Sequence, residues 1–105
     1  MPLPRLEYFK DDQILKVYFN HFETRNAFDI HMAEEFDQLL KDQSPKALYV
    51  SHKTHFFCSG GNLKFYKGLK TKDEGVAINR QIKEILNRLD VLPIPKVANV
   101  NGYCY

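Results

Sequence analysis

HFFCSGGNLK, residues 55–64, is the most unusual junction in this chain. An apolar run ends at Cys58. Ser59, Gly60 and Gly61 follow it, and a basic, aromatic segment begins a few residues later. Paired glycines permit unusual backbone angles and allow another molecule to approach bare N–H groups closely. The junction therefore indicates a turn whose backbone contacts a ligand.

Four strand-like segments surround this junction. The polar residues 10–13 predict that the first two segments form an opening hairpin. The third segment is apolar and runs into the junction, whereas the fourth is expected to be a buried strand that ends at the turn signal Asn101-Gly102. In chain order the four segments are residues 6–9, 14–19, 47–50 and 97–100.

Two amphipathic helices separate the later strands. Asp29 can cap the first helix, and Pro93 and Pro95 end the second. The resulting order, β-β-α-β-α-β, predicts one α/β domain over residues 1–105, with the glycine pair just beyond a strand, where α/β proteins usually build ligand sites. The apolar stripes are Phe28, Met32, Phe36, Leu39 and Leu40 in the first helix and Ile78, Ile82, Ile85, Leu86 and Leu89 in the second.

Composition and charge exclude several classes of protein. The chain has 105 residues, 44% hydrophobic and 27% charged, with a formal net charge of +2, which is ordinary for a globular domain and too mild for nucleic-acid binding. Charges break every apolar run, so we expect no signal peptide and no membrane partner. We expect a soluble, cytoplasmic protein in which Cys58 and Cys104 are free thiols.

The glycine pair is compatible with phosphate cradling or with oxyanion stabilisation. Consecutive N–H groups in a glycine turn can hold an anion or a polarised carbonyl oxygen. A P-loop would need a Gly-Lys-Ser/Thr ending, and a dinucleotide fingerprint would need three spaced glycines. The sequence SGGN at residues 59–62 supplies neither, so oxyanion stabilisation is the better physical fit.

Other interpretations of this region stay open. The glycines can form an ordinary tight turn, and Cys58 beside His55 suggests a nucleophile, although the apolar run favours a packed cysteine. His52, His55 and Cys58 share a three-residue spacing, but strand residues at that spacing alternate faces and no fourth ligand is evident, so no metal is expected. Residues 64–70, KFYKGLK, form either a solvated loop or a lid over a ligand.

Three blocks of sequence are similar to one known family: RNA at residues 25–27, FCSGGNL at residues 57–63 and IPKVANVNGY at residues 94–103. They resemble the enoyl-CoA hydratase/isomerase family, the crotonases, in order and in separation. The resemblance extends over nearly the whole chain. Because family members are typically much longer, residues 1–105 resemble the amino-terminal portion of a crotonase-like domain.

The resemblance implies an incomplete spiral of ββα units that binds an acyl-coenzyme A thioester. The backbone N–H of Gly61 would supply half of an oxyanion hole, whereas the second donor and the acid/base carboxylates would follow Tyr105. Coenzyme A is then part of the substrate, no separate cofactor is expected, and the complete protein is expected to form homotrimers or hexamers. The residues expected near coenzyme A are Arg25, Ala27, Ser59, Gly60, Asn62, Leu63 and Lys64, with Arg25 and Lys64 near its phosphates.

The expected function is hydration or double-bond isomerisation of an acyl-CoA in fatty acid metabolism. Asn62 departs from the family, which most often has Asp after the oxyanion residue, and this difference leaves the particular reaction open. We expect the 105-residue chain alone to be inactive, because the resemblance places the second donor beyond it. A non-catalytic acyl-CoA-binding or assembly module and an inactive fragment are the alternatives.

Overall fold

An antiparallel hairpin opens the fold in the computed structural model, which describes residues 4–105. Strands β1 (Leu6–Asp11) and β2 (Ile14–Phe19) pair along their whole length, which confirms the predicted hairpin. Asp12 and Gln13 form the turn with φ of 47° and 71°, and positive φ at both positions suits the twist of the two strands. Because this turn needs only two residues, β1 is longer than the predicted residues 6–9.

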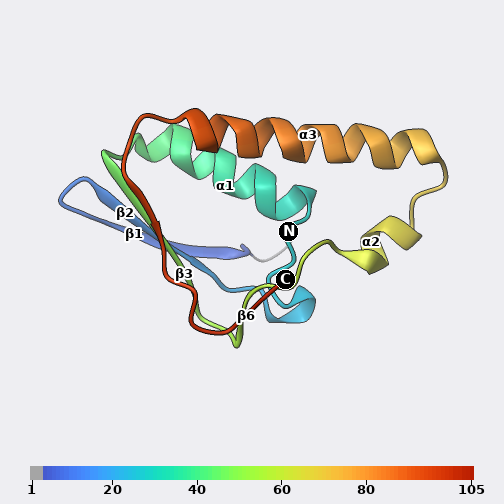
Figure 1. Cartoon of the computed structure of the whole chain (residues 1–105), viewed down its shortest axis with the longest axis horizontal. Coiled ribbons are helices and arrows are strands. Elements are labelled where there is room, and N and C mark those ends of the chain that lie inside the picture. Colours follow the sequence, from blue (N-terminus) through green and yellow to red (C-terminus); the bar gives the residue numbers. More distant parts are fainter. Residues whose placement is uncertain (1–3) are drawn as a thin grey trace.

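The hairpin continues into a four-stranded sheet of order β1-β2-β3-β5. β3 (Ala47–His52) pairs in parallel with β2, and β5 (Lys96–Ala98) pairs in parallel with β3. Parallel neighbours require crossover connections, which contain α1 (Ile30–Gln43) and α3 (Lys72–Val91). Both helices lie on the same side of the sheet (Figure 1).

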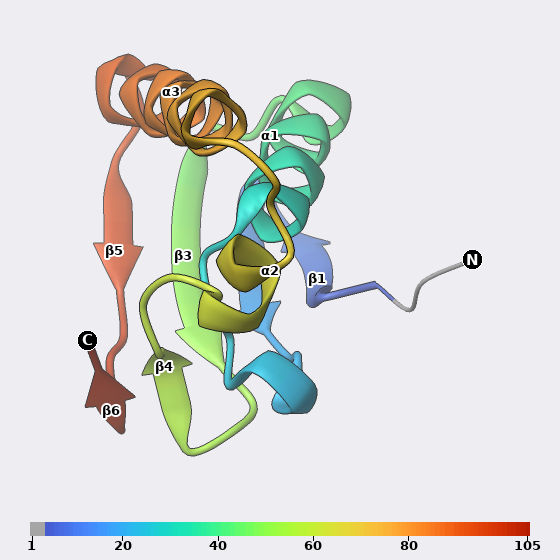
Figure 2. The same ribbon diagram turned by 90° about the vertical axis from the view of Figure 1, so that its right-hand side faces the viewer.

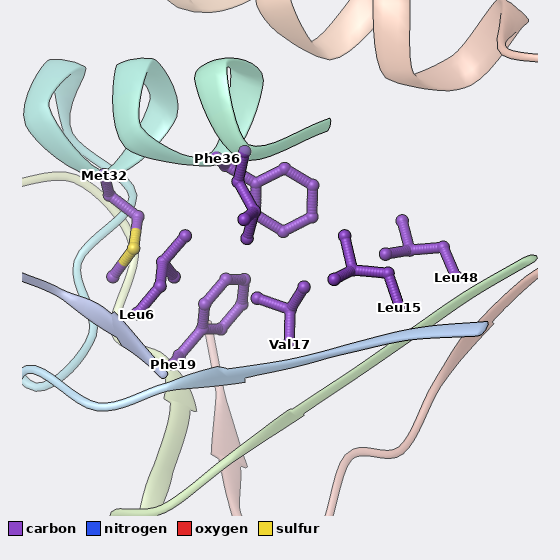
Figure 3. Close-up of a cluster of buried hydrophobic side chains, with 8 residues drawn as sticks. Leu6, Leu15, Val17, Phe19, Met32, Phe36 and Leu48 are labelled. Atoms are coloured by element: carbon purple, nitrogen blue, oxygen red, sulfur yellow. The ribbon is translucent and has the colours of Figure 1, made fainter. Parts of the chain in front are cut away.

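The core lies between α1 and the sheet. Alternate residues of β2 point toward the helix, while Met32 and Phe36 point from α1 toward the sheet (Figure 3). The alternate buried residues of β2 and the apolar stripe of α1 therefore pack against each other in one core layer, as the sequence predicts. The buried cluster contains Leu6, Leu15, Val17, Phe19, Met32, Phe36, Leu39 and Leu48.

Helix α3 is longer and more exposed than its sequence pattern suggests. It begins at Lys72, where the side chain of Thr71 caps it by accepting a hydrogen bond from the Glu74 N–H at 3.2 Å. Ile85 is the buried residue of its stripe, and Leu86 is 43% exposed. The amino-terminal half of α3 extends past α1 (Figure 1), and Val76 in that half is 46% exposed. Within residues 4–105, no helix combines the length and apolarity needed to cross a membrane.

The glycine junction is built differently from the prediction. β3 does not run into it, because β3 ends at His52 and a separate strand, β4 (Phe56–Cys58), follows a turn. β4 pairs in parallel with β6 (Tyr103–Cys104), and the two strands lie side by side in Figure 2. A Cβ on Gly102 would lie 2.2 Å from the carbonyl oxygen of His55. Glycine is therefore required where the β5–β6 turn meets the start of β4.

One further expectation is wrong, and another is wrong in part. The strand predicted at residues 97–100 and expected to be buried is β5, which spans residues 96–98 and is exposed at every position. Residues 64–70 are not a continuous loop, because α2 (Leu63–Lys67) begins directly after the glycine turn, whereas the lid over a ligand stays a prediction. The side chain of Asn62 caps α2 by accepting a hydrogen bond from the Phe65 N–H at 3.0 Å, so a residue expected to form a turn starts a helix.

Candidate functional site

The glycine turn borders a cavity of about 520 Å³. Seven of the eight site residues expected from the sequence line this cavity, and only Gly60 does not. Five further residues also line the cavity: Glu23, Thr24 and Phe65 are sequence neighbours of predicted residues, whereas Arg5 and His31 reach the cavity from other segments. The complete lining is Arg5, Glu23, Thr24, Arg25, Ala27, His31, Ser59, Gly61, Asn62, Leu63, Lys64 and Phe65.

Two hydrogen bonds fasten the glycine turn to the segment that contains the RNA block. The Ser59 hydroxyl donates to the carbonyl oxygen of Thr24 at 2.8 Å, and the N–H of Phe28 donates to the carbonyl oxygen of Gly60 at 2.8 Å. Ala27 lies between these anchors and is 1% exposed. Two blocks that are more than 30 residues apart in the chain thus form one wall of the cavity.

Asn26 stabilises the same wall from inside. It is 1% exposed and has a left-handed φ of 58°, a conformation that asparagine tolerates better than most residues. Its Oδ1 accepts from the His21 N–H at 2.7 Å, and its Nδ2 donates to the Phe56 carbonyl at 2.6 Å and to Thr54 Oγ1 at 2.9 Å. One side chain therefore joins the end of β2 to the start of β4.

The two glycines have different structural roles. Gly60 has a φ of 99°, which favours glycine, although a Cβ there would meet no atom within 4 Å. Gly61 lacks a positive φ, and a Cβ there would lie 3.5 Å from the Tyr66 ring, an ordinary contact. Within residues 4–105, the N–H of Gly61 donates no hydrogen bond to the protein. Gly60 therefore provides the turn, and Gly61 provides an unpaired donor at the cavity.

The cavity carries two cations that are not engaged by carboxylates. Arg25 and Lys64 are exposed, and neither forms an ion pair within the described part of the chain. The Arg25 guanidinium lies 5.8 Å from the centre of the Phe56 ring, close enough for a cation–π contact. Arg5 differs, because its guanidinium is bound to the Asp29 carboxylate at 2.7 Å. Arg25 and Lys64 are thus the cations available to an anionic ligand.

The histidine and cysteine residues considered above make contacts within the protein. Within residues 4–105, no three ligand side chains gather to hold a metal. His52 uses Nδ1 to contact the Thr54 carbonyl and Nε2 to accept from the Asn101 N–H at 2.9 Å, so it holds two loops together. Cys58 Sγ accepts from the Gly60 N–H at 3.4 Å, and Cys58 and Cys104 are free thiols, as predicted.

The electrostatics of the cavity wall depend on the buried Asp29. Burial by itself raises the pKa of this carboxyl group, but hydrogen bonds from Met32, Asn62 and Arg5 outweigh burial and hold the pKa below its ordinary value. Because the folded pKa is below the unfolded one, the ionised carboxylate stabilises the fold above about pH 4. This stabilisation is lost as the pH falls through the folded pKa.

Asp29→Asn is therefore expected to lower the free energy of unfolding by about 1.5–3 kcal/mol at neutral pH. The difference from the parent protein should narrow as the pH falls below about 4 and through the folded pKa of Asp29, because the parent loses the same charge. Urea denaturation at a series of pH values measures this. The pKa of Asp37 is also lowered, chiefly by a hydrogen bond from Arg88. Asp37 is present in both the parent and the Asp29→Asn variant, so its contribution to the pH dependence of the unfolding free energy cancels in the difference. A constant difference across this range would contradict the expectation.

The last described residues lie beside the glycine turn. The Tyr103 N–H donates to the His55 carbonyl at 3.0 Å, and the Tyr105 N–H donates to the Cys58 carbonyl at 2.9 Å. β6 therefore follows β4 toward the turn (Figure 2). Any chain that continues from Tyr105 starts next to the residues that lead into Gly61.

The fold is an α/β domain with a cavity just beyond the end of a strand, and backbone and cationic groups line that cavity. The chain belongs to the enoyl-CoA hydratase/isomerase family, which matches residues 10–105. It is 31% identical over 96 residues to ethylmalonyl-CoA decarboxylase of Xenopus laevis, which covers 88% of this chain and 32% of the relative. It is 35% identical over 79 residues to the fatty acid oxidation complex subunit alpha of Vibrio vulnificus (strain CMCP6), which covers 74% of this chain and 11% of the relative.

Solved structures show that the fold is part of the crotonase fold. Pseudomonas aeruginosa AtuE superimposes with a TM-score of 0.83 at 24% identity, over 95% of this chain and 41% of that chain. The enoyl-CoA hydratase of Bacillus anthracis gives a TM-score of 0.82 at 18% identity, over 94% of this chain and 40% of that chain. The chain spans about a third of the length of the decarboxylase relative, so the predicted incomplete crotonase fold is confirmed.

Proposed function

We propose that the cavity beside Gly61 binds an acyl-coenzyme A thioester and that the Gly61 N–H donates to the thioester oxygen. The observation that carries this proposal is the N–H itself, which belongs to a cavity-lining residue and has no acceptor among residues 4–105. A backbone donor directed at an oxygen that gains negative charge stabilises a transition state by about 3–4 kcal/mol. Gly61 would supply one half of such an oxyanion hole.

The reaction we propose passes through an oxyanion or enolate of the thioester. Hydration and double-bond isomerisation are the first candidates, in keeping with the description of the family. Decarboxylation is a second candidate, because a 31% identical relative is named ethylmalonyl-CoA decarboxylase. Loss of CO2 from a malonyl-type thioester leaves an enolate oxygen that the same donor would stabilise. In this proposal the second donor follows β6, whose pairing with β4 directs the chain toward Gly61.

The phosphates of coenzyme A would lie near Arg25 and Lys64. These side chains line the cavity and have no ion-pair partners in residues 4–105. Arg5 lines the same cavity, but its charge is balanced by Asp29. The proposal therefore assigns phosphate contacts to Arg25 and Lys64 and not to Arg5.

Arg25→Ala and Lys64→Ala are each expected to weaken binding of butyryl-CoA roughly tenfold, which corresponds to about 1.4 kcal/mol. The loss should shrink at high salt, because exposed charges are screened. Isothermal titration calorimetry with the 105-residue chain measures both effects. Lys83→Ala is the matched control, since Lys83 is exposed on α3 and does not line the cavity. Equal losses in all three variants would indicate nonspecific attraction and contradict the proposal.

Turnover separates the enzyme from the binding-module alternative. A version extended to include the second donor should convert crotonyl-CoA if the protein is a hydratase, or release CO2 from ethylmalonyl-CoA if it is a decarboxylase. Butyryl-CoA is saturated and reports on binding alone. A protein that binds butyryl-CoA but converts neither reactive thioester would support the non-catalytic module.

A further inference from the structure

A buried carboxylate connects the glycine turn to two distant parts of the fold. Asp29 is 1% exposed, and its Oδ1 accepts from the Met32 N–H at 2.9 Å. Its Oδ2 accepts from Arg5 Nη1 at 2.7 Å and from Asn62 Nδ2 at 3.0 Å. One side chain thus holds the start of α1, the residue before β1 and the residue after Gly61.

The amide of Asn62 uses both of its ends. Nδ2 donates to Asp29, and Oδ1 accepts from the Phe65 N–H at 3.0 Å, which caps α2. This orientation is the one that satisfies both partners, because an ionised carboxylate only accepts and a backbone N–H only donates. Gly61 is the residue before Asn62, so its N–H lies one peptide away from a side chain fixed at two points.

We propose that Asp29 is a positioning residue for the Gly61 N–H and that the carboxylate at position 29 is what requires an amide at position 62. This inference rests on the proposed function, because the placement of that N–H matters for catalysis only if it donates to the thioester. Asp29 does not line the cavity. It acts through Asn62, which does.

The pairing explains why Asn62 differs from the residue type that the family resemblance led us to expect. A carboxylate at position 62 could still cap α2, but it would place an oxygen against Asp29 Oδ2, where the structure has a donor at 3.0 Å. Two carboxylates that share a site cannot both ionise without a large cost. Arg5 is the cation bound to Asp29, so one positive charge would have to balance two negative ones.

Exchanging the two residues tests this proposal. Asn62→Asp brings two carboxylates together, whereas the double variant Asp29→Asn/Asn62→Asp restores one carboxylate and one amide in reversed positions. We expect Asn62→Asp to lower the folding equilibrium constant roughly 10- to 100-fold. The folding equilibrium constant of the double variant should be at least about tenfold higher than the value obtained by multiplying the two single-variant effects. A coupling of this size is expected for groups in direct contact.

The amide resonance of Gly61 reports on positioning rather than on stability alone. We expect Asn62→Asp to shift the Gly61 ¹H–¹⁵N signal and to speed its hydrogen exchange, and the double variant to return both toward the parent values. Asp37→Asn is the matched control, because Asp37 is also an α1 aspartate with cationic partners, Arg88 and Lys41. That control should destabilise the chain and leave the Gly61 signal in place.

The proposal is overturned if the single effects simply add or if the Gly61 signal moves equally in Asp37→Asn. If Asn62→Asp alone does not fold, the comparison uses Asp29→Asn as its starting point. Adding Asn62→Asp to that background should then be neutral or stabilising, and strong destabilisation would overturn the proposal. Titration with butyryl-CoA separates this inference from the proposed function, because a parent protein that fails to bind would refute the function while the coupling between positions 29 and 62 still stands.

Discussion

Gly61→Pro is expected to lower turnover of an acyl-CoA substrate by roughly two to three powers of ten in a version extended to include the second donor. Proline removes the N–H that we assign to the oxyanion hole. Gly61→Ala keeps that N–H, requires no left-handed φ, and places a Cβ 3.5 Å from the Tyr66 ring. The alanine variant should therefore stay close to the parent rate, and steady-state kinetics on both variants measures the difference.

A folding defect could imitate the loss of the donor. Proline restricts the residue before it, and Gly60 has a φ of 99°, so the turn could change shape. Circular dichroism and butyryl-CoA affinity of the proline variant must therefore match the parent before the rates are compared. Equal rates in well-folded proline and parent proteins would remove Gly61 from the mechanism.

Asn26→Ala is expected to cost about 2–4 kcal/mol of unfolding free energy, a large share of the roughly 5–15 kcal/mol that stabilises a typical domain. The substitution removes the hydrogen bonds to His21, Thr54 and Phe56 and leaves alanine at a φ of 58°. Asn26→Gly loses the same bonds but relieves the backbone strain, so it should be less damaging by about 1 kcal/mol. Urea denaturation followed by circular dichroism measures both changes.

Asn20→Ala is the matched control for this prediction. Asn20 also belongs to the segment after β2, but its side chain makes an exposed hydrogen bond to Glu7. Its loss should change the unfolding free energy by less than about 0.5 kcal/mol. If Asn26→Ala is no more harmful than Asn20→Ala, then Asn26 does not hold the wall of the cavity together.

The sequence predicts the elements whose stability comes from residues close together in the chain. The hairpin follows from two β-rich runs around Asp12 and Gln13, and α1 follows from its apolar spacing and the Asp29 cap. β4 and β6 were missed because they contain three and two residues, too few to show a period. Their pairing depends on a close approach of Gly102 to the carbonyl oxygen of His55. No local sequence pattern predicts this approach.

The residues of the candidate site likewise include some that local motifs predict and some that only the folded structure brings together. The glycine turn and the RNA block are local motifs, and seven of the residues expected from them line one cavity. Arg5 and His31 were missed because they reach that cavity through the folding of other segments. One local signal was available for α2, since Asn62 precedes Phe65 at the spacing of a helix cap. The functional roles of the lining residues stay predictions.

The anchors of the glycine turn come from one earlier stretch of the chain. Ser59, Gly60 and Asn62 bind Thr24, Phe28 and Asp29, and none of these three contacts involves α3 or β6. A substitution confined to the exposed face of α3 therefore leaves all three anchors in place, and we expect it to have little effect on the position of the Gly61 N–H.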